Sequence, residues 1–249
     1  MRIPVLKGTI KRRLLVNFRV DPEAITHVLP PPFRPKLHRG YAIAGICLIR
    51  LERIRPHGLP GFIGLCSENA AHRIAVEWTD PSGAEREGVF IPRRDTSSRL
   101  NCFAGGRLFP GEHHYAKFTV SDDGRHIDFT MDSRDGEVSV RVIGDASDKL
   151  PASSIFDSLL EASAFFEGGC LGYSVTRDAT RFDGLRLCTL EWRVGALAVT
   201  TACSSFFEDT SRFPAGTIQF DHALVMRDIV HEWHQTEDLH GINQPQAAQ

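Results

Sequence analysis

Glu68 and His72 form a pair of residues that could carry out proton transfer. In a strand over 66–78, alternation puts both on the face that Ile74 and Trp78 mark as buried. A buried carboxyl group beside an imidazole shifts both pKa values toward neutrality, where proton transfer is most effective. We therefore expect both residues to face a polar cavity. The alternative is a strand end in solvent, or a bulge that changes the register.

A second set of polar residues lies on a strand over 112–120. His114 shares one face with apolar residues, which leaves His113, Tyr115 and Lys117 on the other. That face meets either solvent or a polar interior. Because adjacent histidines point to opposite faces, they cannot bind one metal ion from a regular strand. We take His113 as a further acid–base candidate, Lys117 as a candidate imine-forming amine, and Tyr115 as a substrate contact.

Arginines mark the candidate anion-binding positions. Arg93 and Arg94 stand at a strand end, directly before Asp95 and a predicted helix N-terminus. Guanidinium groups beside unpaired backbone N–H groups can bind a carboxylate or a phosphate. An exposed loop with salt-bridged arginines is the alternative. With Arg107, these two arginines form the substrate-binding set that we expect.

Signatures of other sites are absent from the sequence. It contains no nucleophile elbow, P-loop or dinucleotide fingerprint. The run His231-Glu232-Trp233-His234 has the wrong spacing for a metalloprotease helix, and we interpret it as a surface tail. Six cysteines are spread singly, without a C-x-x-C pair, and are most simply core residues in a reducing compartment. We expect no metal and no cofactor.

Composition excludes further classes of protein. The 29 Lys+Arg against 31 Asp+Glu give a formal net charge of -2, which argues against a nucleic-acid binder. Five of these basic residues are lysines and 24 are arginines, which favours anion recognition over amine chemistry. No apolar run is long enough for a membrane helix, and basic residues interrupt the place of a signal peptide. We expect a cytoplasmic protein that binds neither nucleic acid nor membrane.

Period-2 patterns predict the elements that must position these residues. Segments rich in β-branched and aromatic residues, separated by turn residues, predict strands over 5–20, 41–54, 62–78, 86–92, 112–121, 125–132, 137–144, 171–177, 185–194, 196–203 and 217–227. Three short helices are expected over 22–29, 96–104 and 155–167, with Asp21, Asp95 and Ser154 as N-caps.

Long strands with few helices predict a mainly β fold. We expect a large, mostly antiparallel β-cone or barrel with a central cavity, because closure removes exposed sheet edges. The chain is short enough for a single domain over 1–240, followed by a flexible C-terminal tail over 241–249.

Several segments resemble the acetoacetate decarboxylase-like superfamily. The strand and helix over 17–33 resemble its N-terminal strand, helix and Val-Val-Pro-x-Pro-Leu segment. Cys66-Ser67-Glu68 resembles its Tyr-Thr-Glu strand, and Gly106-Arg107-Leu108 resembles its Gly-Arg-Glu-Leu. Segments 67–73, 91–96 and 205–209 are more similar to a YqjF-like bacterial family of unknown function. The resemblance spans most of the chain and implies a β-cone with a central cavity in a homo-oligomer.

The resemblance implies less about activity. Acetoacetate decarboxylase works through a lysine Schiff base beside a second lysine in a Pro-Lys-Lys run. The corresponding segment here, 109–115, has no lysine, and Lys117 lies on the matching strand. Glu68 matches one active-site glutamate of the family, whereas the other would fall within 42–45, where there is no carboxylate. The resemblance therefore implies the shape of a decarboxylase without its lysine pair.

Two functions remain open. One is a lyase-like enzyme, distinct from a true acetoacetate decarboxylase, that acts on a small keto or carboxylic acid by Glu/His acid–base chemistry. The other is a non-catalytic protein that binds a small organic acid or carbonyl compound in its cavity. Both need the same pocket, and resemblance of fold does not separate them.

Overall fold

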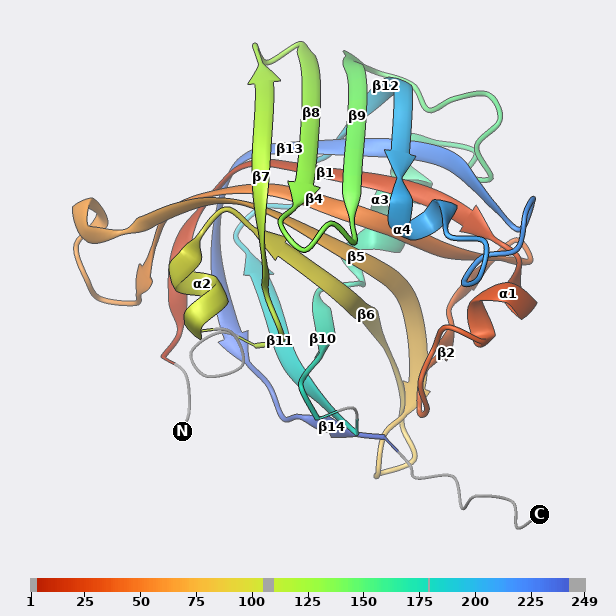
Figure 1. The fold of residues 1–249 in the computed structure, drawn as a ribbon, viewed down its shortest axis with the longest axis horizontal. Coiled ribbons are helices and arrows are strands. Elements are labelled where there is room, and N and C mark those ends of the chain that lie inside the picture. The colour runs from red at the N-terminus through yellow and green to blue at the C-terminus, as the bar shows by residue number, and fades with distance from the viewer. Residues whose placement is uncertain (1–3, 105–109, 179, 242–249) are drawn as a thin grey trace.

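The computed structural model describes residues 4–104, 110–178 and 180–241, which are mostly β structure (Figure 1). No helix in these ranges is long and apolar enough to cross a membrane. The helices are α1 (Pro22–Thr26), η1 (Gly61–Ile63), α2 (Arg99–Ala104), α3 (Leu159–Glu167) and α4 (Ser205–Glu208). The strands are β1 (Leu6–Val20), β2 (Arg34–Pro35), β3 (Leu37–His38), β4 (Tyr41–Pro56), β5 (Leu65–Thr79), β6 (Glu85–Thr96), β7 (His114–Asp122), β8 (His126–Ser133), β9 (Ser139–Ser147), β10 (Leu171–Val175), β11 (Arg181–Thr189), β12 (Gly195–Ser204), β13 (Ile218–Gln235) and β14 (Leu239–His240).

The strands join in one large mixed sheet. The mainly β fold is confirmed, and most neighbouring strands are antiparallel, as the turn residues between them predict. β6 is the exception, because it runs parallel to both β7 and β10. Parallel neighbours cannot be joined by a tight turn, and the chain from β6 to β7 passes through α2.

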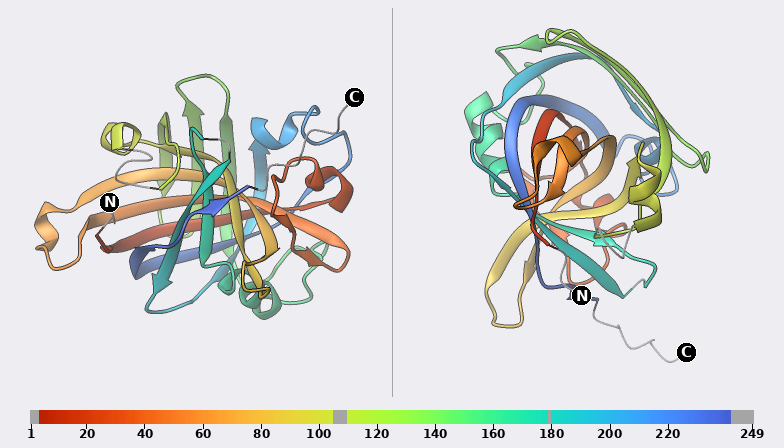
Figure 2. Two further views of the ribbon diagram at one scale, coloured as in Figure 1. Left: turned by 90° about the horizontal axis from the view of Figure 1, so that it is seen from below. Right: turned by 90° about the vertical axis from the view of Figure 1, so that its left-hand side faces the viewer.

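The pairings close into two circuits of strands that share one wall. β13, β1, β4, β5 and β6 form this wall; β7, β8, β9 and β12 connect its edges on one side, and β10 and β11 connect them on the other. Figure 2 shows the long, curved wall strands from two further directions. Both faces of the wall are buried, so its strands carry apolar residues at consecutive positions. Leu14 and Val16 pack into one core and Leu15 into the other.

The two cores differ in what covers them. The first core, which holds Leu14 and Val16, contains a group of aromatic rings around Phe33. The ring centroids of Trp78 and Phe182 lie 5.7 and 5.4 Å from that of Phe33. The second core, which holds Leu15, includes Phe166 from α3. This helix therefore covers part of the wall face on which the candidate site is found.

The predicted helix ends are right at some positions and wrong at others. The Asp21 side chain accepts a hydrogen bond of 2.9 Å from the Glu23 N–H, so α1 begins as predicted. α3 ends before Gly168 as predicted, but its N-cap is Ser158, because the Ser154 hydroxyl donates instead to buried Asp221 at 2.9 Å.

Two predictions about strand ends are wrong. Asp95 does not cap a helix; it lies inside β6, where its carboxylate accepts hydrogen bonds from buried Arg93, and α2 begins only at Arg99. The segment 231–234 is not a surface tail but part of β13, which pairs with β1 and β11 up to Gln235. His231 is 1% exposed there. Of the predicted tail over 241–249, residues 242–249 lie outside the described part of the chain.

Candidate functional site

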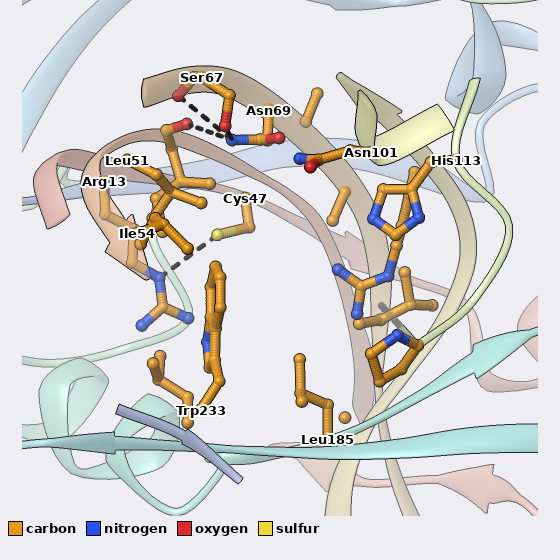
Figure 3. Close-up of a pocket in the computed structure, with 18 of the residues that line it drawn as sticks. Arg13, Cys47, Leu51, Ile54, Ser67, Asn69, Asn101, His113, Leu185 and Trp233 are labelled. Carbon is orange, nitrogen blue, oxygen red and sulfur yellow. Dashed lines mark hydrogen bonds between the residues drawn. The ribbon is translucent and has the colours of Figure 1, made fainter. Parts of the chain in front are cut away.

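A pocket with a cavity volume of about 150 Å³ lies inside the circuit that passes through β10 and β11. Its walls come from β1, β4, β5 and β6 on one side and from β10, β11 and β13 on the other (Figure 3). The apolar part of the lining includes Leu6, Leu51, Ile54, Leu185, Leu187 and Trp233. The pocket therefore suits a small organic molecule.

Three arginines reach this pocket from neighbouring wall strands: Arg13, Arg73 and Arg94. Arg94 Nε donates to Ser174 Oγ at 2.9 Å, and an Arg73 Nη donates to Asn17 Oδ1 at 2.5 Å. Within the described residues, the Arg13 Nη1 and Arg73 Nε atoms are buried without a hydrogen-bond partner. Arg13 and Arg73 thus keep donors unused at or beside the cavity.

These three arginines differ from buried Arg12 and Arg93 in having no ion pair. An Arg12 Nη atom lies 2.7 Å from a Glu68 carboxylate oxygen, and an Arg93 Nη atom lies 2.9 Å from an Asp95 carboxylate oxygen. Asp95 also lines the pocket, but its carboxylate accepts hydrogen bonds from Arg93. In the described ranges no carboxylate lies within 4.0 Å of the guanidinium nitrogens of Arg13, Arg73 or Arg94, although the charge of Asp183 acts on Arg94 from farther away. The pocket therefore holds three guanidinium groups without a direct ionic partner.

Burial gives this arrangement an energetic cost. It lowers the pKa of Arg73 and that of Arg94 to about 10. Because both values lie well above neutrality, both side chains remain charged. A buried charge without a partner is destabilising, and Arg73 is 4% exposed. An anionic ligand would supply the missing partner.

His113 lines the same pocket, and its tautomer follows from its contact with the backbone. Its Nδ1 atom lies 3.2 Å from the carbonyl oxygen of Gly111. A carbonyl oxygen only accepts, so Nδ1 carries the hydrogen and Nε2 keeps a lone pair. Burial, reinforced by the charge of Arg94, lowers the pKa of His113 to about 3. The imidazole is therefore neutral near pH 7, with an unprotonated Nε2 atom.

The loop before β7 holds His113 beside Arg94 by tight packing. Gly111 has a φ of 82°, and a Cβ there would lie 2.5 Å from Ser174 Cβ and 3.5 Å from Arg94 Nε. Its N–H donates to Asp183 Oδ2 at 2.9 Å. A glycine is needed because any side chain would push the loop away from Ser174.

Amides complete the polar lining. Asn69 Nδ2 donates to Ser67 Oγ at 2.9 Å, and Asn69 Oδ1 accepts from the Thr96 hydroxyl at 2.7 Å. Asn101 comes from α2. Figure 3 shows Asn69 and Asn101 above the cavity, with His113 on the opposite side from Arg13. Residues that could orient a ligand thus come from several elements.

Glu68 and His72 lie on the other face of β5. Residues 67, 69, 71 and 73 line the pocket, so the alternate positions point toward the first core. Glu68 forms its ion pair with Arg12 there, and burial raises the pKa of Glu68. The His72 Nε2 atom lies 2.9 Å from Ser204 Oγ, and its ring packs against Phe206. Neither residue lines the pocket.

The other predicted site residues are also dispersed. Lys117 is exposed on β7, opposite Asp132. Tyr115 lies under Arg99, whose guanidinium carbon is 5.5 Å from the ring centroid. Arg93 is held in its cluster of carboxylates, and Arg107 lies outside the described residues. Of the predicted set, Arg94 and His113 are the two described residues that line the pocket.

Sequence reasoning missed several pocket residues, notably Arg13, Cys47, Arg73 and Trp233. One signal was available. Arg13 and Arg73 each stand inside a long, mostly apolar strand pattern, where a charged residue needs a partner or a function. Within the described residues, no group of three or more His, Cys, Asp or Glu could hold a metal ion.

Comparison with known proteins agrees with this architecture. The model of the family DUF2071, described as an uncharacterized conserved protein, matches residues 8–196, more than half of the chain. No curated protein matches the chain. The matched range includes Arg13 of β1 and the pocket residues of β4, β5, β6, β10 and β11.

Solved structures share the fold at low identity. The acetoacetate decarboxylase of Legionella pneumophila is 12% identical, with a TM-score of 0.55 over 95% of this chain and 88% of that one. MppR, an enduracididine biosynthesis enzyme complexed with pyruvate, is 14% identical, with a TM-score of 0.55 over 96% and 90%. An acetoacetate decarboxylase-like enzyme from Sphingomonas wittichii is 11% identical, with a TM-score of 0.55 over 97% and 92%. The resemblance to the acetoacetate decarboxylase-like superfamily is confirmed at the level of fold.

Proposed function

The chain belongs to the DUF2071 family and shares its fold with acetoacetate decarboxylases, and on this premise we propose that it binds a small keto or carboxylic acid in the arginine-lined pocket. One observation carries the proposal. Within the described residues, no carboxylate lies within 4.0 Å of the guanidinium groups of Arg13, Arg73 and Arg94. A ligand carboxylate would complete this charge balance and satisfy buried donors.

Arg94 is the principal carboxylate-binding residue in this proposal. Ser174 and the Gly111 loop fix its Nε side, which leaves its Nη atoms for a ligand. The planar fork of a guanidinium group matches a carboxylate through two parallel hydrogen bonds. The apolar lining around Leu185 and Trp233 then accommodates the carbon chain.

His113 favours a catalytic extension of the same function. The neutral imidazole has a free Nε2 lone pair. The negative charge of a bound carboxylate would offset the charge of Arg94 and raise the pKa of His113, so that Nε2 takes a proton from the carbon next to the ligand's carbonyl group. The positive charge of Arg94 would stabilise the enolate that forms. Imine chemistry is not part of the proposal, because no lysine is among the described residues that line this pocket.

Calorimetric titration with pyruvate and acetoacetate tests the binding function. We expect the acids to bind the wild-type chain and the matched control Arg86→Gln, which changes an exposed arginine of the same strand. Arg94→Gln should weaken binding at least ~10-fold, since a hydrogen bond to a charged group contributes about 1.5–3 kcal/mol. Equal affinities of Arg94→Gln and Arg86→Gln for these acids would contradict the proposal.

Proton exchange tests the catalytic extension. In deuterated water, wild-type protein should speed exchange of the methyl protons of pyruvate, followed by NMR. His113→Gln should remove most of this acceleration while pyruvate still binds. Binding without any acceleration in the wild-type chain would leave the protein as a non-catalytic binder and sink the acid–base role.

A further inference from the structure

A thiol lies among the arginines of the pocket. Cys47, on β4, lines the cavity, and its Sγ atom lies 3.3 Å from Arg13 Nε, which donates to it. Figure 3 shows this contact beside Trp233. The charges of Arg73 and Arg94 also interact with the thiol position. Arg13 therefore contacts the thiol of Cys47 directly, and Arg73 and Arg94 line the same cavity.

Strand register explains why Cys47 and Arg94 can act on one ligand. Cys47 is paired with Ala71 across β4 and β5, and Ala71 is paired with Arg94 across β5 and β6. Only the methyl group of Ala71 thus stands between Cys47 and Arg94 along this row of paired residues. A ligand that extends from Arg94 across Ala71 would therefore reach the sulfur.

We propose that Cys47 is a nucleophilic site for small α,β-unsaturated carboxylic acids. The inference rests on the proposed acid-binding pocket and adds a covalent step to it. The ligand carboxylate binds Arg94 and the unused donors of Arg73 and Arg13, which places its double bond near Sγ.

The covalent step is an addition without oxidation or reduction. A sulfur electron pair forms a bond to the β-carbon, and the thiol proton leaves to water. The π electrons of the double bond form a C–H bond at the α-carbon with a proton from water. The sum is the addition of S–H across the double bond.

An exposed cysteine outside the pocket provides an internal control. Cys47 is 9% exposed and lines the pocket, as do the exposed Cys66 and Cys170, whereas the exposed Cys188 and Cys203 do not line it. Cys188, on β11, does not line the pocket and, among the described residues, has no hydrogen bond to an arginine. Its reaction rates serve as the reference for each reagent outside the arginine pocket.

Monomethyl and dimethyl fumarate are the test pair, because both add to thiols but only the monoester carries a carboxylate. The rates of modification of Cys47 and Cys188 in the wild-type chain are followed by peptide mass mapping. We expect the monoester-to-diester rate ratio to be at least ~10-fold higher at Cys47 than at Cys188, since a positive pocket concentrates anions. Arg94→Gln should lower the ratio at Cys47, and excess pyruvate should protect this residue.

Equal ratios at the two cysteines, or an unmodified Cys47 beside fully modified Cys188, would overturn the inference. These outcomes are separable from failure of the proposed function. If pyruvate binds and Arg94→Gln weakens its binding while Cys47 shows no preference, the covalent step alone fails. If pyruvate does not bind the wild-type chain, the proposed function fails.

Discussion

The Nδ1 atom of His113 lies 3.2 Å from the carbonyl oxygen of Gly111, and this contact leaves the Nε2 atom unprotonated. The loop that makes the contact is fixed by a glycine packed against Ser174 and by Asp183. One short segment thus positions His113 beside Arg94, the two residues to which the proposed function gives proton transfer and carboxylate binding.

The low pKa of His113 predicts acid sensitivity. Folding lowers this pKa from the usual 6.5 to about 3, so between these values the unfolded chain binds more protons. The stability from neutral His113 is complete above about pH 6.5 and is lost as the pH falls toward 3. Between pH 7 and pH 5, the free energy of unfolding measured in urea should fall more for the wild-type chain than for His113→Gln. An equal loss in both would contradict the burial argument.

Gly111→Ala should damage both stability and binding. Its φ of 82° and the 2.5 Å approach of a new Cβ to Ser174 predict a cost of at least ~1–3 kcal/mol. Pyruvate binding should weaken as well, because the loop beside Arg94 must move.

Gly124→Ala is the matched control for that variant. Its φ is 92°, and nothing lies within 4 Å of a new Cβ. Backbone strain should therefore lower its stability while pyruvate binds with wild-type affinity by calorimetry. If both glycine variants lose affinity equally, the packing of Gly111 is not what positions the site.

Glu68 should matter for stability and not for ligand binding. Its side chain is paired with buried Arg12 at 2.7 Å on the wall face away from the pocket. Glu68→Ala leaves the Arg12 charge without its main partner, which should cost about 3 kcal/mol in urea unfolding. Exposed Glu191→Ala should stay within about 0.5 kcal/mol of wild type. If the Glu68→Ala chain folds but no longer binds pyruvate, Glu68 takes part in the ligand site, and its assignment to stability alone is wrong.

The apolar lining predicts a preference for longer acids. 2-Oxohexanoate has three more methylene groups than pyruvate, and each buried one contributes about 0.8 kcal/mol. It should bind at least ~10-fold more tightly, and Leu185→Ala should reduce that preference. Leu190→Ala is the control, because Leu190 is 80% exposed on the surface. Equal affinities for the two acids would show that the carbon chain of the ligand does not reach the apolar lining.

The fold could be predicted from the sequence because alternation is local. In β5, Ile74, Trp78 and His72 do share the buried face that alternation assigns to them. The same rule could not reveal that the opposite face is also buried and opens into the pocket. That depends on β10 and β11 closing the second circuit, which is a long-range property.

The site could be predicted only in part for the same reason. Arg94 and His113 were identified from local polar runs, whereas Arg13 and Cys47 meet only when β1 and β4 pair and curve. Asp95 was misassigned because its sequence context fits a helix cap. Its tertiary contact with buried Arg93 keeps it in the strand instead.

Comparing the binding of pyruvate with that of its uncharged analogue pyruvamide isolates the contribution of the carboxylate to affinity. The two ligands have nearly the same size, so a difference in their dissociation constants reports recognition of the carboxylate. The arginine pocket predicts that pyruvate binds the wild-type chain at least ~10-fold more tightly, and that Arg94→Gln largely removes this difference. Equal binding of the two ligands to the wild-type chain, or no binding of either, would contradict the account.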